Sequence, residues 1–163
     1  MPRRAEALAS RIEQGAANLI AFAETLNDDE WRTIVAPDGR TVGVIVHHVG
    51  FVYPIEIDLT RLLAEGKPMP ATWADVAQLN AKHAKDHANV TKRDAIDLIR
   101  DNSKAAAEAV RGFTDEQLDN SNTGAMYANA PITAQFFIED HPVRHSWHHL
   151  AKLRACLGKV EVV

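Results

Sequence analysis

The stretch TVGVIVHHVGFVYPIEIDLTRLL, residues 41–63, combines a helix cap with a helical rhythm of apolar side chains. Thr41 carries a hydroxyl that can cap the start of a helix. The apolar side chains behind it share one helix face, and they are Val42, Ile45, Val46, Val49 and Tyr53. Pro54 lies inside the stretch, so we expect a kink there or a join between two helices.

Three further segments show the same rhythm on either side of this stretch. They are residues 4–27, residues 91–113 behind a capping Thr91, and a last helix from Ile132 to Leu157 that ends before Gly158. A shorter polar helix is expected within residues 73–89, and residues 119–131 (DNSNTGAMYANAP) are expected to form a loop. No segment has the pattern of a clear β-sheet strand.

Four long amphipathic helices predict an all-α four-helix bundle with a short extra helix between the second and third long helices. No linker or internal repeat divides the chain, so we expect one domain over residues 1–163. The long connections are compatible with either an up-down-up-down or a crossover topology.

The composition limits the class of protein. Apolar residues make up 46% of the chain, and a net charge of −4 without a basic stripe argues against nucleic-acid binding. Cys156 is the only cysteine, which excludes an internal disulfide, and we expect it to be a small buried core residue. The apolar runs are shorter than the roughly 20 residues of a membrane helix, and no signal peptide is evident. We therefore expect a cytoplasmic protein without a membrane segment.

Histidines cluster near the end of the chain, in HPVRHSWHHL, residues 141–150. On a helical wheel His145 and His149 lie at the edge of the apolar stripe, whereas His141 and His148 lie further toward solvent. Two imidazoles one turn apart can hold one metal ion, but a stable site needs a third ligand. His141 precedes Pro142, which favours a flanking or supporting role.

The third ligand has two candidate sources, His47–His48 and the HAKDH motif that contains His83 and His87. His48 borders the predicted core of its helix and His47 points away from it. His83 and His87 lie among charged residues and have the pattern of a solvated face. The predicted metal ligands are therefore His48, His145 and His149. Three protein ligands with an open position are typical of a catalytic zinc-type site.

No catalytic residue other than these ligands can be assigned from the sequence. The nearest carboxylate to the face that carries His48 is Glu56, two turns further along, which is a weak candidate for a general base.

These motifs resemble those of the DinB/YfiT-like proteins. TVGVIVHHVG is similar to the second-helix motif of that family, in which a Ser or Thr opens the helix and a histidine follows seven residues later, here His48. HSWHHLAKLRACLG is similar to the last-helix motif, whose histidine pair falls here on His145 and His149. Pro54, Pro142 and the segment 150–152 depart from the family pattern, which often has Arg-Gly-Gln after the second histidine of the pair.

The resemblance implies a four-helix bundle, often a homodimer, that holds a divalent metal, commonly zinc or nickel, on three histidines. It also implies relatives that transfer low-molecular-weight thiols, and a mycothiol-dependent isomerase with a similar domain. We therefore expect a metal-dependent enzyme that activates a thiol for S-transfer, or water for hydrolysis, on a small-molecule substrate. The alternative is a non-enzymatic dimerisation or stress-response binding module with a structural metal or none.

Overall fold

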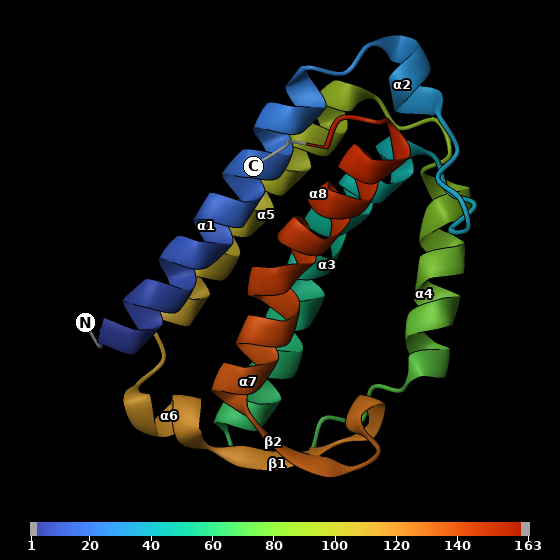
Figure 1. The fold of residues 1–163 in the computed structure, drawn as a ribbon. Coiled ribbons are helices and arrows are strands. Elements are labelled where there is room, and N and C mark those ends of the chain that lie inside the picture. Colours follow the sequence, from blue (N-terminus) through green and yellow to red (C-terminus); the bar gives the residue numbers. More distant parts are fainter. Residues whose placement is uncertain (1–2, 161–163) are drawn as a thin grey trace.

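Four long helical segments pack lengthwise in the computed structural model, which describes residues 3–160 (Figure 1). This confirms the predicted all-α four-helix bundle, and the predicted short extra helix is α4. Asparagine and threonine side chains cap most helix starts by accepting a backbone N–H of the first turn, as Thr41 and Thr91 do. The helices are α1 (Arg3–Glu24), α2 (Asp28–Arg32), α3 (Val42–Ala64), α4 (Trp73–Asp86), α5 (Lys92–Arg111), α6 (Asp115–Asp119), α7 (Ala134–Ile138) and α8 (Arg144–Cys156).

The long helices run up, down, down and up along the bundle (Figure 1). Helix α5 packs between α1 and α3, and α8 packs against the same two helices from the other side. Helix α4 lies on the outside of the bundle and returns the chain from the end of α3 to the end at which α3 began (Figure 1). Helix α5 therefore starts at that end and runs in the same direction as α3. Of the two topologies compatible with the sequence, the structure therefore has a crossover connection.

Helix α3 continues from Val42 to Ala64 through Pro54. Of the two alternatives expected at Pro54, a kink or a join between two helices, the join is therefore wrong. A proline has no N–H to donate to the carbonyl four residues earlier, which here belongs to Gly50. The side chain of Asn102 on α5 donates to the Gly50 carbonyl instead, at 2.9 Å. Gly50 also permits the close approach of α5, because a Cβ at this position would lie 2.8 Å from the backbone nitrogen of Ile99.

The predicted last helix, Ile132–Leu157, is divided into three helical segments. Helix α7 begins at Ala134 behind the capping Thr133, a π-helical turn spans Glu139–Val143, and α8 follows. Pro142 lies in the π-helical turn, which accommodates a residue that cannot donate to an α-helical ladder. His141 therefore lies inside the helical segment rather than ahead of it.

Residues 119–131 were expected to form a loop, and this expectation is wrong. Strand β1 (Ser121–Gly124) pairs with β2 (Ala130–Thr133) in an antiparallel hairpin, with Ser121 opposite Thr133, and a short 3-10 turn, Ala125–Tyr127, joins them. The hairpin lies across one end of the bundle (Figure 1). Its strands are four residues long and lack an apolar alternation, so a periodicity argument does not reveal them.

Helix α3 is the one helix in the described part of the chain that is long and apolar enough to cross a membrane by length and composition. From the lengths of the apolar runs we expected no such segment. In the structure, 72% of its most apolar window is buried against the rest of the protein. The apolar character of α3 is thus accounted for by its position inside the bundle, where α5, α7 and α8 cover it.

Candidate metal centre

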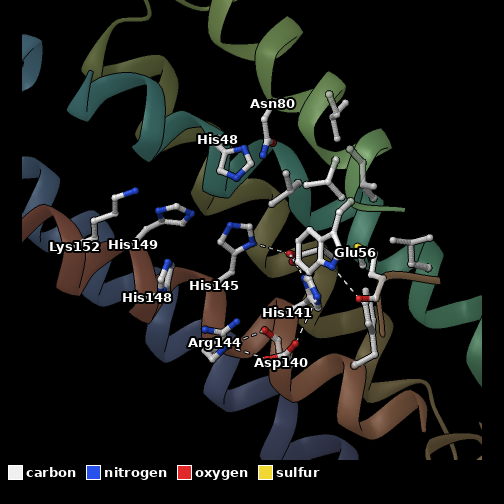
Figure 2. A pocket seen from close by; sticks show the side chains of 18 of the residues that line it. His48, Glu56, Asn80, Asp140, His141, Arg144, His145, His148, His149 and Lys152 are labelled. Atoms are coloured by element: carbon white, nitrogen blue, oxygen red, sulfur yellow. Dashed lines mark hydrogen bonds and ion pairs between the residues drawn. The ribbon is translucent and has the colours of Figure 1, made fainter. Parts of the chain in front are cut away.

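Helices α3 and α8 bring together the three histidines that the sequence singled out. His48, His145 and His149 each offer one nitrogen, and these nitrogens lie within 4.8 Å of one another. The ring of His48 lies 5.1 Å from that of His145 and 5.5 Å from that of His149, between centroids. Figure 2 shows the three rings directed into the same space between the two helices. We call this group the inner histidine cluster.

Two rings of the inner histidine cluster are deeply buried. His48 is 4% exposed and His149 is 6% exposed. Burial, assisted by the charges of the neighbouring histidines, lowers the pKa of both rings well below the usual range. Both rings are therefore neutral at pH 7 and have a lone pair to offer. Within residues 3–160 the Nδ1 atoms of both rings have no hydrogen-bond partner, which fits rings whose polar partner is a ligand from outside the chain.

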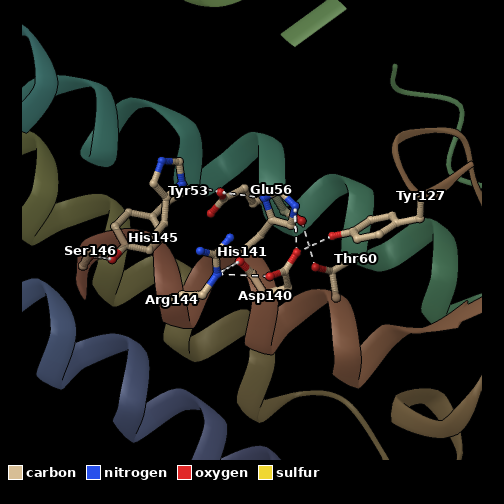
Figure 3. A network of polar contacts seen from close by, with 9 residues as sticks. All are labelled: Tyr53, Glu56, Thr60, Tyr127, Asp140, His141, Arg144, His145 and Ser146. Atoms are coloured by element: carbon tan, nitrogen blue, oxygen red, sulfur yellow. Dashed lines mark hydrogen bonds and ion pairs between the residues drawn. The ribbon is translucent and has the colours of Figure 1, made fainter. Parts of the chain in front are cut away.

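Glu56 fixes the third ring. One turn of α3 presents its carboxylate to α8, where Oε1 accepts a hydrogen bond from Nδ1 of His145 at 2.6 Å (Figure 3). Burial raises the pKa of Glu56, but the charges and hydrogen bonds of His145 and His141 outweigh burial and hold this pKa below its usual value. A carboxylate that accepts from Nδ1 leaves Nε2 of His145 as the nitrogen with a free lone pair, the arrangement found behind metal-bound histidines.

The polar network continues beyond Glu56 along the π-helical turn. Nδ1 of His141 lies 3.5 Å from Oε1 of Glu56, and Nε2 of His141 lies 3.7 Å from Oδ2 of Asp140. Tyr127 donates to Asp140 at 2.7 Å, and Arg144 pairs with the same carboxylate at 3.0 Å (Figure 3). His141 thus has a supporting position behind the inner histidine cluster, one of the two roles that the sequence left open.

A cavity of about 320 Å³ opens beside the inner histidine cluster, between α3, α4 and the segment from α7 to α8. The histidines line one part of it, together with Asp38, Arg40 and Lys152. Apolar side chains line the other part (Figure 2), and they include Val52, Leu59, Val76, Leu79, Met126 and Phe137. A concave site with a few grouped polar residues and an apolar remainder is suited to a small molecule.

A charged loop closes the polar part of the cavity. Asp38 accepts from Arg40 at 2.6 Å and from Nζ of Lys152 on α8 at 2.6 Å, and these partners hold the pKa of Asp38 far below its usual value. Nη1 of Arg40 is buried and has no partner within residues 3–160. Lys152, which departs from the family pattern, therefore anchors the loop that carries Arg40.

The structure corrects the interpretation of two other histidines and extends that of a third. His47 points away from the bundle core, as expected, but α4 covers it, so it is only 7% exposed. His83 and His87 are not a solvated face, because α4 turns both rings toward α3 and His83 is 3% exposed. The signal that could have grouped them is their own four-residue spacing, which is the same as that of His145 and His149.

The remaining residues considered in the sequence have simpler positions. His148 is exposed at the cavity wall. Trp147 packs over α1 at Gly15, where a Cβ would lie 2.9 Å from the indole nitrogen, and it is 38% exposed. Cys156 is exposed, so the expected core role is wrong. Leu153 in the same turn is fully buried, so Cys156 lies on a side of α8 that the bundle does not cover.

Comparisons with known proteins agree with this architecture. No curated protein matches the chain. Among solved structures, the chain is similar to YfiT from Bacillus subtilis, described as a probable metal-dependent hydrolase with an unusual four-helix bundle topology. The TM-score is 0.75 at 20% sequence identity, over 96% of this chain and 89% of that one, which supports the fold. The family model of the DinB superfamily matches residues 11–153, most of the sequence, and the chain therefore belongs to the DinB superfamily.

Proposed function

We propose that the protein is a metal-dependent enzyme in which His48, His145 and His149 hold one divalent cation, zinc or nickel, beside the small-molecule cavity. The observation that carries this proposal is the convergence of three histidine nitrogens within 4.8 Å, next to a cavity that a substrate can enter. Three imidazoles suit zinc and nickel, and three protein ligands leave a position for a reactant.

A bound divalent cation would supply Lewis acidity, which lowers the pKa of a water or thiol held beside it and polarises an electrophile. Glu56 keeps the His145 tautomer and ring orientation that ligation requires. His141 lies behind Glu56, and Asp140 lies beyond the other nitrogen of the His141 ring. Arg40 has a guanidinium N–H without a partner in the described residues, which is available to an oxygen atom of the substrate.

Two reactions are consistent with this site, hydrolysis with water as the nucleophile and S-transfer with a low-molecular-weight thiol. Hydrolysis is supported by YfiT, which shares the fold and is described as a probable metal-dependent hydrolase. S-transfer is supported by the resemblance of the helix motifs to the DinB/YfiT-like proteins, a family that includes thiol-dependent transferases. In both reactions the apolar part of the cavity, around Val52 and Leu79, would hold the non-reacting part of the substrate and exclude water from it.

Elemental analysis of protein purified without an affinity tag tests the metal assignment. We expect an ion held by the inner histidine cluster in the wild type and its loss in His48→Ala. His148→Ala is the matched control, since it removes a neighbouring imidazole that is exposed and outside the cluster. An ion content in His48→Ala that equals that of the wild type would contradict the assignment.

Activity assays of the loaded protein then separate the two reactions and the non-enzymatic alternative. Ester, amide and lactone substrates test hydrolysis, and electrophiles offered with cysteine or glutathione test S-transfer. Turnover that disappears in His48→Ala supports the enzyme. Chelation that lowers thermal stability while neither panel shows turnover supports a binding module with a structural metal.

We further propose that the protein acts in the cytoplasm as a homodimer. Its single cysteine is exposed and unpaired, which suits a reducing compartment. Light scattering after size-exclusion chromatography measures the assembly state directly, and a mass of one chain at micromolar concentration would contradict the dimer.

A further inference from the structure

A second group of three histidines lies between α3 and α4, beside the inner histidine cluster. His47 of α3 and His83 and His87 of α4 each offer one nitrogen within 4.8 Å of the others. Their ring centroids lie 5.0 Å (His47–His83), 4.2 Å (His47–His87) and 4.7 Å (His83–His87) apart. We call this group the outer histidine cluster. The two clusters meet where the His48 and His83 rings lie 5.6 Å apart.

Hydrogen bonding within the protein does not account for this arrangement. Within residues 3–160 the three rings make one hydrogen bond, between Nδ1 of His47 and Nε2 of His83 at 2.8 Å. His83 is 3% exposed, and its other nitrogen, Nδ1, is buried without a partner. Buried polar atoms are ordinarily paired, and packing alone would favour apolar side chains at these positions.

The geometry and charge of the outer histidine cluster suit a metal ion. A zinc–nitrogen distance of about 2.0–2.1 Å in a tetrahedral site places two ligand nitrogens roughly 3.3–3.4 Å apart. The 2.8 Å distance between Nδ1 of His47 and Nε2 of His83 therefore has to increase by only about half an ångström. Small rotations of the two rings supply this change. Asp86, Asp94 and Lys85 line the adjoining cavity of about 410 Å³, so its lining contains two carboxylates and one ammonium group. A carboxylate there can complete the coordination or offset the charge of the ion.

We propose that His47, His83 and His87 form a second site for a divalent transition-metal ion, which fastens the C-terminal end of α4 to α3. Imidazole ligands favour zinc, nickel, cobalt or copper over calcium or magnesium. Helix α4 packs mainly on α3, and its N-terminal end is held by Trp73, whose indole N–H donates to the Met126 carbonyl at 2.8 Å. The ion would hold the other end of the helix.

The position of α4 gives this second site a consequence for the substrate cavity. Trp73, Val76, Leu79 and Asn80 of α4 form one wall of the cavity beside the inner histidine cluster. An ion in the outer histidine cluster would fix this wall without contacting the substrate.

Metal stoichiometry tests the second site. Protein stripped by a chelator, reloaded with zinc sulfate and dialysed should bind about two zinc ions in the wild type and in His148→Ala, about one in His87→Ala or His149→Ala, and none in the double variant His87→Ala/His149→Ala. One ion in the wild type that His149→Ala loses and His87→Ala retains would overturn the second site. One ion that His87→Ala loses and His149→Ala retains would instead overturn the proposed function alone.

Hydrogen exchange keeps the test decisive if His87→Ala is less stable. His149→Ala retains the whole outer histidine cluster, and zinc at a hundredfold excess over its dissociation constant should slow amide exchange in residues 80–87 by about tenfold or more. Amides of α1 in the same sample serve as the internal control. Unchanged exchange in α4 of zinc-treated His149→Ala would overturn the proposal.

Discussion

The two histidine clusters use the same parts in different surroundings. Each combines one histidine of the adjacent pair His47–His48 with two histidines spaced by four residues on a second helix. In the inner histidine cluster Glu56 accepts from His145, and a cavity with apolar walls lies alongside. In the outer histidine cluster the one ring hydrogen bond found within residues 3–160 joins two of the histidines themselves, and the adjoining cavity is lined by charged side chains.

The difference shows that a ligand set does not by itself define a role. A supporting carboxylate raises the basicity and fixes the orientation of a ligand, and an apolar cavity gives a reactant a place that water does not fill. The inner histidine cluster has both features, so we assign it the chemistry. Within residues 3–160 the outer histidine cluster has no carboxylate hydrogen-bonded to a ring and no cavity with apolar walls beside it. It joins α4, on the outside of the bundle, to α3, so we assign it a fastening role.

The largest expected effect separates these roles. His145→Ala should remove the ion of the inner histidine cluster and lower turnover by about 10³-fold or more, since the cation supplies several kcal/mol of transition-state stabilisation. His87→Ala should lower turnover by less than about tenfold, because it changes the position of a cavity wall and removes no ligand of the reacting site. Turnover of the best substrate from the hydrolysis and thiol panels measures both. Equal losses in the two variants would show that the clusters are not separate in role.

The inner histidine cluster was predictable from the sequence because all its information is local. The wheel positions of His48, His145 and His149 relative to their own apolar stripes place them at the core margin, and two core helices of one bundle must meet there. The structure does bring these residues together. Their role as ligands stays a prediction until metal is measured.

The outer histidine cluster was missed because it depends on where α4 lies, which is not a local property. His83 and His87 lie among Lys82, Lys85 and Asp86, and such a polar helix gives no signal that one face is covered. The hairpin of β1 and β2 was missed for a related reason, since its four-residue strands are held by pairing and not by an apolar pattern.

The second largest effect concerns the carboxylate that only the inner histidine cluster possesses. Glu56→Ala should weaken zinc binding there by about 10- to 100-fold, the usual consequence of removing a carboxylate behind a metal-bound histidine. Glu56→Gln should weaken it less, because the amide oxygen still accepts from Nδ1 of His145. Competition with a chelating dye, in the His87→Ala background, isolates this site. An equal loss of zinc affinity on Glu56→Ala in the His149→Ala background would contradict a specific link between Glu56 and the inner histidine cluster.

A third prediction uses acid to compare the clusters in metal-free protein. Burial, with the charges of neighbouring histidines, lowers the pKa of His83 to about 4, below the value of about 6.5 expected in the unfolded chain. The unfolded state therefore binds the proton first, and the free energy of unfolding falls as the pH decreases from about 6.5 to about 4. One such histidine lowers the free energy of unfolding by about 2 kcal/mol at pH 5.

His83→Gln should make the loss of unfolding free energy between pH 7 and pH 5 smaller by about 2 kcal/mol, as measured by urea denaturation. His48→Gln should show a similar reduction and also a difference below pH 4, because burial, with the charges of His145 and His149, holds the pKa of His48 lower than that of His83. A pH dependence that is unchanged in His83→Gln would contradict a neutral, buried ring in the outer histidine cluster.

The smallest expected effect should leave the comparison between the clusters intact. Pro54 has no N–H to donate to the Gly50 carbonyl, and Asn102 supplies the donor in its place. Asn102→Ala removes this donor and should lower the free energy of unfolding by about 1 kcal/mol. His47 and His48 lie within one turn of Gly50 on the same helix, so any change of metal affinity should be equal for both clusters. Zinc titrations in the His87→Ala and His149→Ala backgrounds measure this.

A double variant shows whether the Gly50 carbonyl is the cause. Pro54→Ala restores a backbone N–H four residues after Gly50, so the Asn102→Ala loss should become smaller by about 1 kcal/mol in the Pro54→Ala background. The same loss in both backgrounds would mean that Asn102 stabilises α5 by another contact. The continuity of α3, from which both clusters take one histidine, would then need a different explanation, because its proline would have no compensating donor.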